Sequence, residues 1–231
     1  MTIKKTIAIA SAKGGVGKST VCSYLAAELS KSSKVGVLDA DIYGPNQDIL
    51  FNIIDKNIVI NKKNTDRPYT PKIIDSISLN SLGFLLEKNA AIWRGPMLSS
   101  AINQIYEKTE WDDLDYLLID MPPGTGDAYL TVCQKINPDF VILVSTLSKL
   151  SIADLRRSEH VFAVLNTEIL GIVLNNIHQS ENLESFKLDS KNLILDRLEY
   201  NKKFIDSSYP FDDLKLDSLF LKTINAIKEH E

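Results

Sequence analysis

The chain has 231 residues, 44% of them hydrophobic and 24% charged, which is long enough for one sizeable core and short for two. Its formal net charge of -4 and the lack of a long basic run give no reason to expect nucleic acid or an anionic membrane as a partner. Two cysteines are too few for a disulfide-stapled secreted domain, so we expect a cytoplasmic protein built as one domain over residues 1–231.

Short β-rich runs alternate along the chain with helical patterns. The first run, Thr6–Ser11, follows Lys4 and Lys5 much as the apolar part of a signal peptide would. Cleavage after it would remove the strand that leads into the next motif, so we interpret it as a core strand. The later runs are Val35–Asp39, Ile73–Leu82, Tyr116–Asp120, Phe140–Ser145, Ile169–Asn175 and Leu193–Asp196. The alternation predicts an α/β fold, a doubly wound and mostly parallel sheet with helices on both faces.

A glycine-rich loop, Lys-Gly-Gly-Val-Gly-Lys-Ser-Thr, occupies residues 13–20 between the first strand and a helical run. Its three glycines remove side chains that would keep backbone N–H groups away from phosphate oxygens. Lys18 stands where an ammonium reaches the β- and γ-phosphates of a nucleotide, and Ser19 stands where a hydroxyl binds Mg²⁺. We therefore predict a nucleotide site formed by Gly14, Gly15, Val16, Gly17, Lys18, Ser19 and Thr20.

The loop departs from the usual phosphate-loop pattern near its start. Ala12 stands where that pattern has glycine, and Lys13 adds a second lysine. In this respect it resembles the deviant Walker A loop of the MinD/ParA superfamily of dimerising P-loop ATPases. The resemblance implies that Lys13 reaches across a homodimer interface to the partner's nucleotide and takes part in catalysis. The other interpretation is a lysine that stays in solvent.

Two carboxylates follow the second predicted strand. Asp39 and Asp41 lie at the carboxyl end of Val35–Leu38, which is where ligands bind in parallel sheets. One carboxylate could serve a metal while the other orients attacking water, or both could belong to a turn or helix cap. Resemblance to the superfamily assigns Asp41 to the catalytic water and to magnesium, with Asp39 as structural support.

The segment Asp120–Asp127 has the form of a Walker B strand followed by a switch. Asp120 ends an apolar strand and is predicted to hold Mg²⁺, directly or through water. The Pro-Pro-Gly turn after it would place a backbone N–H near the γ-phosphate, and glycines on both sides of Thr125 permit the loop to change shape. Asp127 is predicted to cap a helix that begins near Ala128.

Together, Asp39–Asn46, Trp93–Met97 and Asp120–Asp127 resemble the Mrp family of nucleotide-binding proteins, whose members act in iron–sulfur cluster assembly and transfer. The resemblance runs from about residue 7 to residue 175 and more weakly beyond it. It implies a dimer that binds Mg·ATP and hydrolyses it slowly. It also implies that Asn175 reads the adenine edge, whereas a turn asparagine is the other interpretation.

The chain departs from the family at the place where its members hold a cluster. Those members have a Cys-x-x-Cys pair after the asparagine, which builds a shared [4Fe–4S] site at the dimer interface. Between Asn175 and the last predicted strand this chain has no cysteine, and Cys22 and Cys133 are predicted to be packed thiols inside helices. Leu147–Lys149 and Glu199 also differ from the family's usual residues. A cluster role would therefore involve a hetero-oligomer with a cysteine-bearing relative, or an iron–sulfur apoprotein as partner.

Two further segments contain no candidate site residues. Residues 51–71 are polar and contain Pro68 and Pro71, which predicts an irregular excursion. Asp213–Glu231 places apolar residues at helical spacing, and its excess of acidic side chains favours a helix packed on the core over one on a membrane surface.

The sequence thus predicts a dimeric Mg²⁺-dependent ATPase, and three biological roles stay open. The first is an Mrp-type factor in iron–sulfur cluster assembly or transfer. The second is a positioning or partitioning ATPase of the ParA/MinD kind. The third is a nucleotide-gated regulatory binding protein that carries no cluster.

Overall fold

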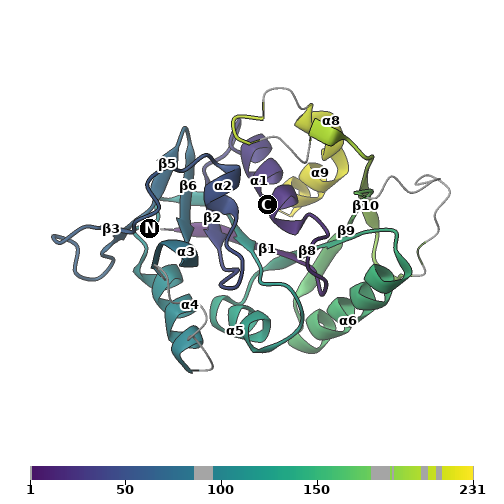
Figure 1. Ribbon diagram of the computed structural model, residues 1–231, viewed down its shortest axis with the longest axis horizontal. Coiled ribbons are helices and arrows are strands. Elements are labelled where there is room, and N and C mark those ends of the chain that lie inside the picture. The colour runs from purple at the N-terminus through teal and green to yellow at the C-terminus, as the bar shows by residue number, and fades with distance from the viewer. Residues whose placement is uncertain are drawn as a thin grey trace.

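The computed structural model describes residues 2–85, 96–177, 188, 190–203, 208–211 and 215–230, and the statements below refer to these. A central sheet separates two layers of helices, as Figure 1 shows. Its strands lie in the order β10-β9-β8-β1-β7-β2-β6-β5. They are β1 (Ile3–Ala10), β2 (Val35–Asp39), β5 (Lys72–Ile74), β6 (Ile77–Ser81), β7 (Leu114–Asp120), β8 (Phe140–Ser145), β9 (Glu168–Asn175) and β10 (Ile194–Leu198).

All neighbouring strands of this sheet are parallel except β5 and β6. The sequence pattern predicted one strand over Ile73–Leu82, and that prediction is wrong. Asp75 adopts a left-handed conformation, with φ of 51°, and turns the chain back on itself after β5. Aspartate tolerates this conformation better than most residues, because its short polar side chain can bond locally.

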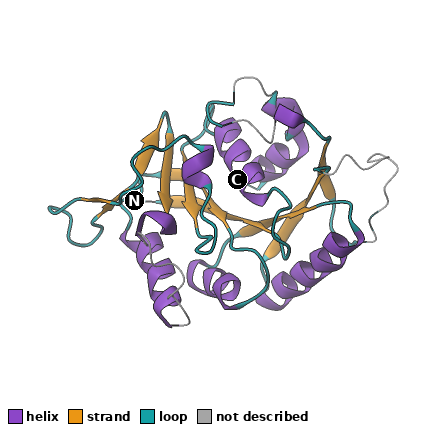
Figure 2. Cartoon of the chain, in the orientation of Figure 1, coloured by secondary structure: helices purple, strands orange, loops and turns teal. Residues whose placement is uncertain are grey.

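Helices cover both faces of the sheet, which confirms the predicted doubly wound fold (Figures 1 and 2). One layer contains α1 (Lys18–Leu29), α8 (Leu216–Leu219) and α9 (Leu221–Glu229), and the other contains α4 (Pro96–Lys108), α5 (Asp127–Ile136) and α6 (Lys149–Leu165). Strand β1 serves both cores: Ile7 and Ile9 pack on the first layer, and Ala8 and Ala10 pack on the second. Successive side chains of a strand point to opposite faces, so a central strand is apolar at every position.

The end of the chain packs on the core, as its apolar spacing predicts. Leu216, Phe220, Ile224 and Ile227 are buried in the same cluster as α1. The segment is divided at Phe220 into α8 and α9 rather than forming one helix. Strand β10 helps to hold it, since Asp196 Oδ2 accepts hydrogen bonds from the backbone N and Oγ of Thr223, at 2.8 and 2.6 Å.

The excursion after β2 contains little regular structure. A short helix, α2 (Gln47–Leu50), precedes it, and a two-stranded antiparallel ribbon, β3 (Val59–Ile60) with β4 (Tyr69–Thr70), projects from the body of the molecule (Figure 1). Helix α3 (Leu82–Leu85) follows β6. The predicted irregular excursion over residues 51–71 is confirmed, apart from this small ribbon.

Helix α5 begins differently from the prediction. Its N-cap residue is Gly126, which forms no side-chain capping bond, and Asp127 is the first helical residue. The predicted capping role of Asp127 is therefore wrong. A carboxylate in the first turn still stabilises the helix, because it lies near the positive end of the helix dipole.

The two cysteines lie on opposite faces of the sheet. Cys22 of α1 is fully buried in one core, and Cys133 of α5 is 3% exposed in the other. Burial raises the pKa of both thiols, that of Cys133 to about 12. In the described part of the chain, no three His, Cys, Asp or Glu side chains form a group that could hold a metal ion. Across the same residues, no helix has the length and apolar character that a membrane crossing requires.

We predict that both thiols react slowly with thiol reagents in the folded protein. At about pH 8, a thiol with a pKa near 12 carries on the order of 10³-fold less thiolate than an unperturbed one, and the thiolate is the reactive form. Reaction with Ellman's reagent should therefore be slow in buffer and complete in guanidinium chloride. Single variants Cys22→Ser and Cys133→Ser assign each phase, and fast labelling of either thiol in the folded protein would contradict its placement in the core.

Candidate functional site

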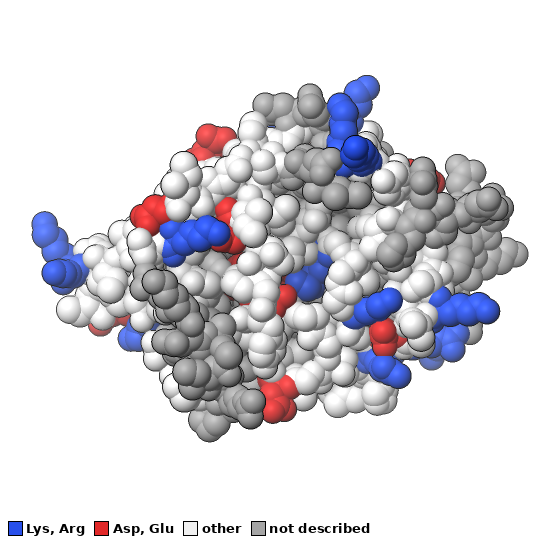
Figure 3. Space-filling view, viewed as in Figure 1, with Lys and Arg blue, Asp and Glu red and all other residues white. Residues whose placement is uncertain are grey.

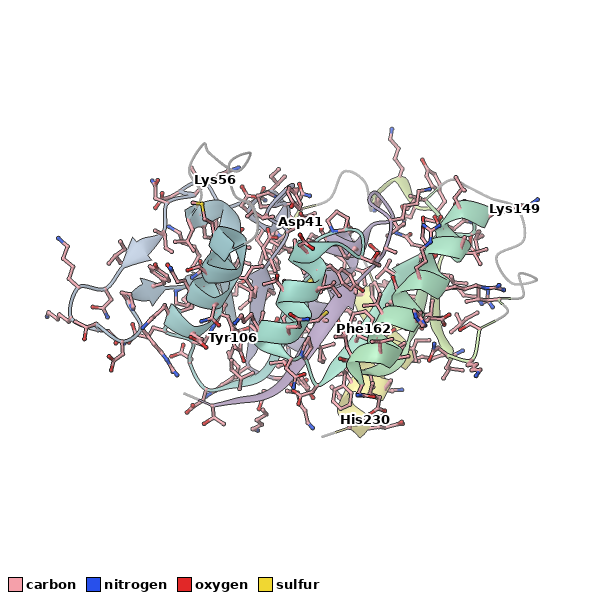
Figure 4. The ribbon with its side chains drawn as sticks, turned by 90° about the horizontal axis from the view of Figure 1, so that it is seen from below. Asp41, Lys56, Tyr106, Lys149, Phe162 and His230 are labelled. Carbon is pink, nitrogen blue, oxygen red and sulfur yellow. The ribbon has the colours of Figure 1, made fainter. Side chains whose placement is uncertain are left out.

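Three loops meet at the carboxyl ends of adjacent strands. Strands β1, β7 and β2 are neighbours in the sheet, so the segments that follow them converge on one edge. There they line a cleft of about 480 Å³, formed by Ser11, Lys13, Gly14, Gly15, Gly17, Lys18, Ser19, Thr20, Asp41, Tyr43, Gly44, Asn46, Ile49, Leu50 and Pro123. Figure 3 shows basic and acidic side chains together in a hollow near the centre of this face. Figure 4 places Asp41 at the same edge as Lys149 and at the opposite edge from His230.

The glycine-rich loop has a backbone that only glycine adopts readily at two positions. Gly15 and Gly17 have φ of 75° and 87°, both in the left-handed region. A Cβ atom at Gly17 would also lie 2.3 Å from Asn175 Nδ2. That amide donates to the backbone oxygen of Val16 at 3.0 Å, so the end of β9 fixes the loop from beside it. The loop is thus held in place by a long-range contact as well as by its own sequence.

Lys18 and Asp120 form a buried ion pair at the base of the cleft. The Lys18 side chain is 6% exposed and that of Asp120 is fully buried. Lys18 Nζ donates to Asp120 Oδ1 and also lies 3.5 Å from Ser19 Oγ. Burial alone would lower the pKa of Lys18, but the charges of Asp120, Asp41 and Asp39 raise it above its usual value. Lys18 is therefore a cation that the surrounding carboxylates stabilise.

Asp39 lies beside Asp120 and organises the loop that follows β2. The two residues are direct neighbours in the parallel register of β2 and β7. Asp39 accepts hydrogen bonds from the backbone N of Asp41, Asn46 and Gln47, at 3.1, 3.1 and 3.2 Å, and from Ser81 Oγ at 3.2 Å. Burial and the charge of Asp120 raise the pKa of Asp39 to about 8. Its contacts are those of a residue that supports the site.

Asp41 combines a turn contact with a place in the cleft. Its Oδ1 accepts from the backbone N of Tyr43 and of Gly44, both at 3.1 Å, as a turn aspartate does. The residue is 7% exposed and lines the cleft. Burial raises its pKa, and the charge of Lys18 acts in the opposite direction. The turn and cleft assignments made from the sequence are therefore compatible.

The segment after β7 packs against the glycine-rich loop. Gly124 has φ of 92°, and its backbone N donates to the oxygen of Ser11 at 3.3 Å. Pro123 lies close to Gly14, where an added Cβ would be 3.8 Å from the proline Cβ. The predicted switch segment and the loop that it would sense are thus in contact.

Lys13 and Asn175 occupy different positions relative to the cleft. Lys13 is half-buried and lines it. Asn175 is 8% exposed, and its contact is with the loop backbone. An adenine-reading role for Asn175 stays a prediction.

Gln47 is a site residue that the sequence did not reveal. It is fully buried at the first position of α2. Its Nε2 donates to Asp120 Oδ2 at 2.8 Å and to the backbone oxygen of Ser19 at 3.0 Å. A single glutamine after the Asp39–Asn46 motif carries no pattern that marks it, because its partners are 28 and 73 residues away in the chain.

The oxygen atoms in the cleft suit Mg²⁺. Ser19, Asp41 and Asp120 offer a hydroxyl and two carboxylates, which are hard oxygen ligands of the kind that this ion prefers. The ammonium of Lys18 lies between Ser19 Oγ and Asp120 Oδ1, so a cation already occupies the space between two of the predicted ligands. By contrast, Cys22 and Cys133 are separated by the sheet and do not fit a shared iron–sulfur cluster.

Known proteins resemble this chain in sequence. The family model described as "ParA: NUBPL iron-transfer P-loop NTPase" matches residues 2–191. An iron–sulfur cluster carrier protein of Rickettsia conorii is 44% identical over 191 residues, which are 82% of this chain and 58% of that protein. The carrier protein of Pseudomonas fragi is 42% identical over 175 residues, 75% of this chain and 60% of that protein. The chain therefore spans less than two thirds of the length of these relatives.

Solved structures share the fold. A nucleotide-binding protein from Archaeoglobus fulgidus, in complex with ADP, is 29% identical, with a TM-score of 0.71 over 99% of this chain and 89% of that one. The cell division ATPase MinD of Pyrococcus furiosus has a TM-score of 0.72 at 18% identity, over 99% and 100% of the two chains. These likenesses agree with the resemblance seen in the Asp39–Asn46 and Asp120–Asp127 motifs. The chain belongs to the family of NUBPL-type iron-transfer P-loop NTPases within the ParA group.

Proposed function

We propose that this protein is a slow Mg²⁺-dependent ATPase that dimerises around its nucleotide and works in iron–sulfur cluster assembly or transfer. The observation that carries the proposal is the Lys18 ammonium held between Ser19 Oγ and Asp120 Oδ1 beneath the glycine-rich loop. This arrangement supports recognition of a phosphate and a metal at one place. Membership in the iron-transfer family supports the biological setting.

The residues of the cleft would divide the work of phosphoryl transfer. Backbone N–H groups of Gly14–Thr20 would cradle the phosphates, and Lys18 would leave Asp120 to contact them. Ser19, Asp41 and Asp120 would hold Mg²⁺, which when bound supplies neutralisation of phosphate charge. Asp41, which lines the cleft, would also orient the attacking water. Catalysis of this kind rests on positioning and charge stabilisation.

Lys13 would complete the site from a second copy of the chain. It lines the cleft and is only half-buried, so its ammonium could reach beyond its own subunit. Dimer formation would then depend on nucleotide, because the partner's phosphates are what the lysine contacts. The contact between Gly124 and Ser11 offers a route by which loss of the phosphate could be felt at that interface.

The iron–sulfur cluster would be cargo whose thiolate ligands come from another chain. Cys22 and Cys133 are buried on opposite faces of the sheet, and each would need its core opened to bind iron. A hetero-oligomer with a cysteine-bearing relative, or direct action on an apoprotein, satisfies this constraint. The same observation favours a second candidate, a nucleotide-gated regulatory protein whose output is a partner contact. The fold is shared with a cell division ATPase and a plasmid partition protein, so a positioning role stays a third candidate.

We predict that Lys18→Ala lowers ATP hydrolysis by on the order of 10²-fold or more, because it removes the cation aimed at the phosphates. A malachite-green assay of phosphate release measures this. Lys31→Ala is the matched control, since Lys31 is an exposed lysine that follows the same helix and pairs with Glu28. Equal phosphate release by wild type and the Lys18 variant would defeat the ATPase assignment.

We predict that Lys13→Ala abolishes nucleotide-dependent dimerisation while the monomer keeps its affinity for a non-hydrolysable ATP analogue within about 5-fold, as expected for one half-exposed charge. Light scattering after gel filtration, with and without the analogue, gives the oligomeric state. Lys18→Ala serves as contrast, because it should lose nucleotide binding itself. A Lys13 variant that still dimerises with the analogue would show that this lysine does not act across the interface.

We predict that the isolated protein holds no cluster after anaerobic reconstitution with iron and sulfide, because its buried thiols cannot reach a common site. Visible absorption and iron analysis after desalting give the result. Stable iron in wild type that is lost in Cys22→Ser or Cys133→Ser would overturn this prediction and support an autonomous carrier.

A further inference from the structure

Gln47 places a neutral amide among the charges at the base of the cleft. Asp120 has two oxygens, and each has a different donor: Lys18 Nζ at Oδ1 and Gln47 Nε2 at Oδ2, the latter at 2.8 Å. The same Nε2 donates to the backbone oxygen of Ser19 at 3.0 Å. Gln47 therefore links the carboxylate of Asp120 to the residue that carries the predicted hydroxyl ligand.

The environment shows that this amide is not a simple space filler. Gln47 is fully buried, and among the residues that the structure describes its buried Oε1 has no hydrogen-bond partner. An apolar side chain of similar size would avoid the unsatisfied oxygen, so the amide is tolerated for what its nitrogen does. Its backbone N also donates to Asp39 Oδ2 at 3.2 Å, which anchors the first residue of α2. The side chain thus leaves a fixed point of the backbone and reaches Asp120.

We infer that Gln47 is a positioning residue for the magnesium site, an inference that rests on the proposed function. When a phosphate draws Lys18 away, Asp120 Oδ1 loses the hydrogen bond from that lysine, while Oδ2 keeps its hydrogen bond from Gln47. The carboxylate is then held with one oxygen fixed and the other free for the metal. Because Gln47 also binds the Ser19 carbonyl, the two ligand-bearing residues keep their relative positions.

The role differs from phosphate binding. Gln47 is not one of the described residues that line the cleft, although its neighbours Asn46, Ile49 and Leu50 are. It would therefore make no direct contact with a nucleotide bound there, and its effect would pass through Asp120 and Ser19. Partners that orient a metal ligand typically change metal affinity by about 10- to 100-fold when they are removed. Loss of the Gln47 amide should therefore weaken the Mg²⁺-dependent part of nucleotide binding more than the metal-free part.

The test measures the binding of a fluorescent ADP analogue, mant-ADP, first in EDTA and then during titration with Mg²⁺. Gln47→Met keeps the length of the side chain and removes the donor, and Gln47→Asn keeps an amide that is one methylene too short to reach Asp120. Both variants should need about 10-fold more Mg²⁺ for half of the metal-dependent change, with affinity in EDTA unchanged within about 2-fold. Gln134→Met, at an exposed position of α5, is the matched control and should behave as wild type.

Each other outcome counts against a specific statement. An unchanged Mg²⁺ response in both variants would overturn the positioning role. An equal loss of affinity in EDTA and in Mg²⁺ would also overturn it, because the amide would then only support the cleft. If Gln47→Met does not fold, as judged by circular dichroism, the Mg²⁺ response of Gln47→Asn alone tests the positioning role. Wild type that binds mant-ADP without any response to Mg²⁺ would overturn the proposed magnesium site itself, and this inference with it.

Discussion

The buried ion pair between Lys18 and Asp120 is the interaction on which the site depends. Removing two opposite charges from water costs several kcal/mol for each ion, and the pair regains this only with good geometry and further hydrogen bonds. Gln47 supplies one of these bonds, and the charge of Asp41 adds to the field that keeps Lys18 protonated. In the nucleotide-free protein, Lys18 and Asp120 therefore neutralise each other's charge.

This pairing explains why nucleotide and metal would bind together. A phosphate that takes Lys18 leaves Asp120 buried with an unpaired charge, which is unfavourable by itself. Asp120 would then be one of the residues that hold Mg²⁺, which when bound would supply positive charge beside this carboxylate. In that way Lys18 and Asp120 would each keep an opposite charge close by. When Lys18 turns to the phosphate, Gln47 would keep its hydrogen bond to Asp120.

The topology of the sheet brings these residues together, and the sequence predicts the fold class and several of its strands. Strands β2 and β8 were predicted with their observed ends, because each is a continuous apolar run with polar residues on both sides. The hairpin at Asp75 was missed, because the apolar pattern continues through the turn. The capping role given to Asp127 was wrong, since aspartate is favoured both at the N-cap and in the first turn, and composition cannot separate the two.

The sequence likewise predicted one part of the site, the motif residues, and missed the contacts that hold them in place. The residues that motifs mark from Lys13 to Thr20, apart from the buried Val16, line one cleft with Asp41, and Asp120 is buried at its base. The contacts that hold them there, from Gln47 to Asp120 and from Asn175 to Val16, join segments 73 and 159 residues apart and follow only from the folded chain.

The placement of the cysteines limits how the family's chemistry can apply to this chain. Cys22 and Cys133 lie in the two cores, with the central sheet between them. A change of loop conformation at the cleft cannot bring them together, because both belong to helices packed on opposite faces. An iron–sulfur role would therefore need thiolates other than Cys22 and Cys133. At the cleft itself, Tyr43 and Ile49 are 65% and 61% exposed. Apolar side chains therefore border the place where the nucleotide is proposed to bind.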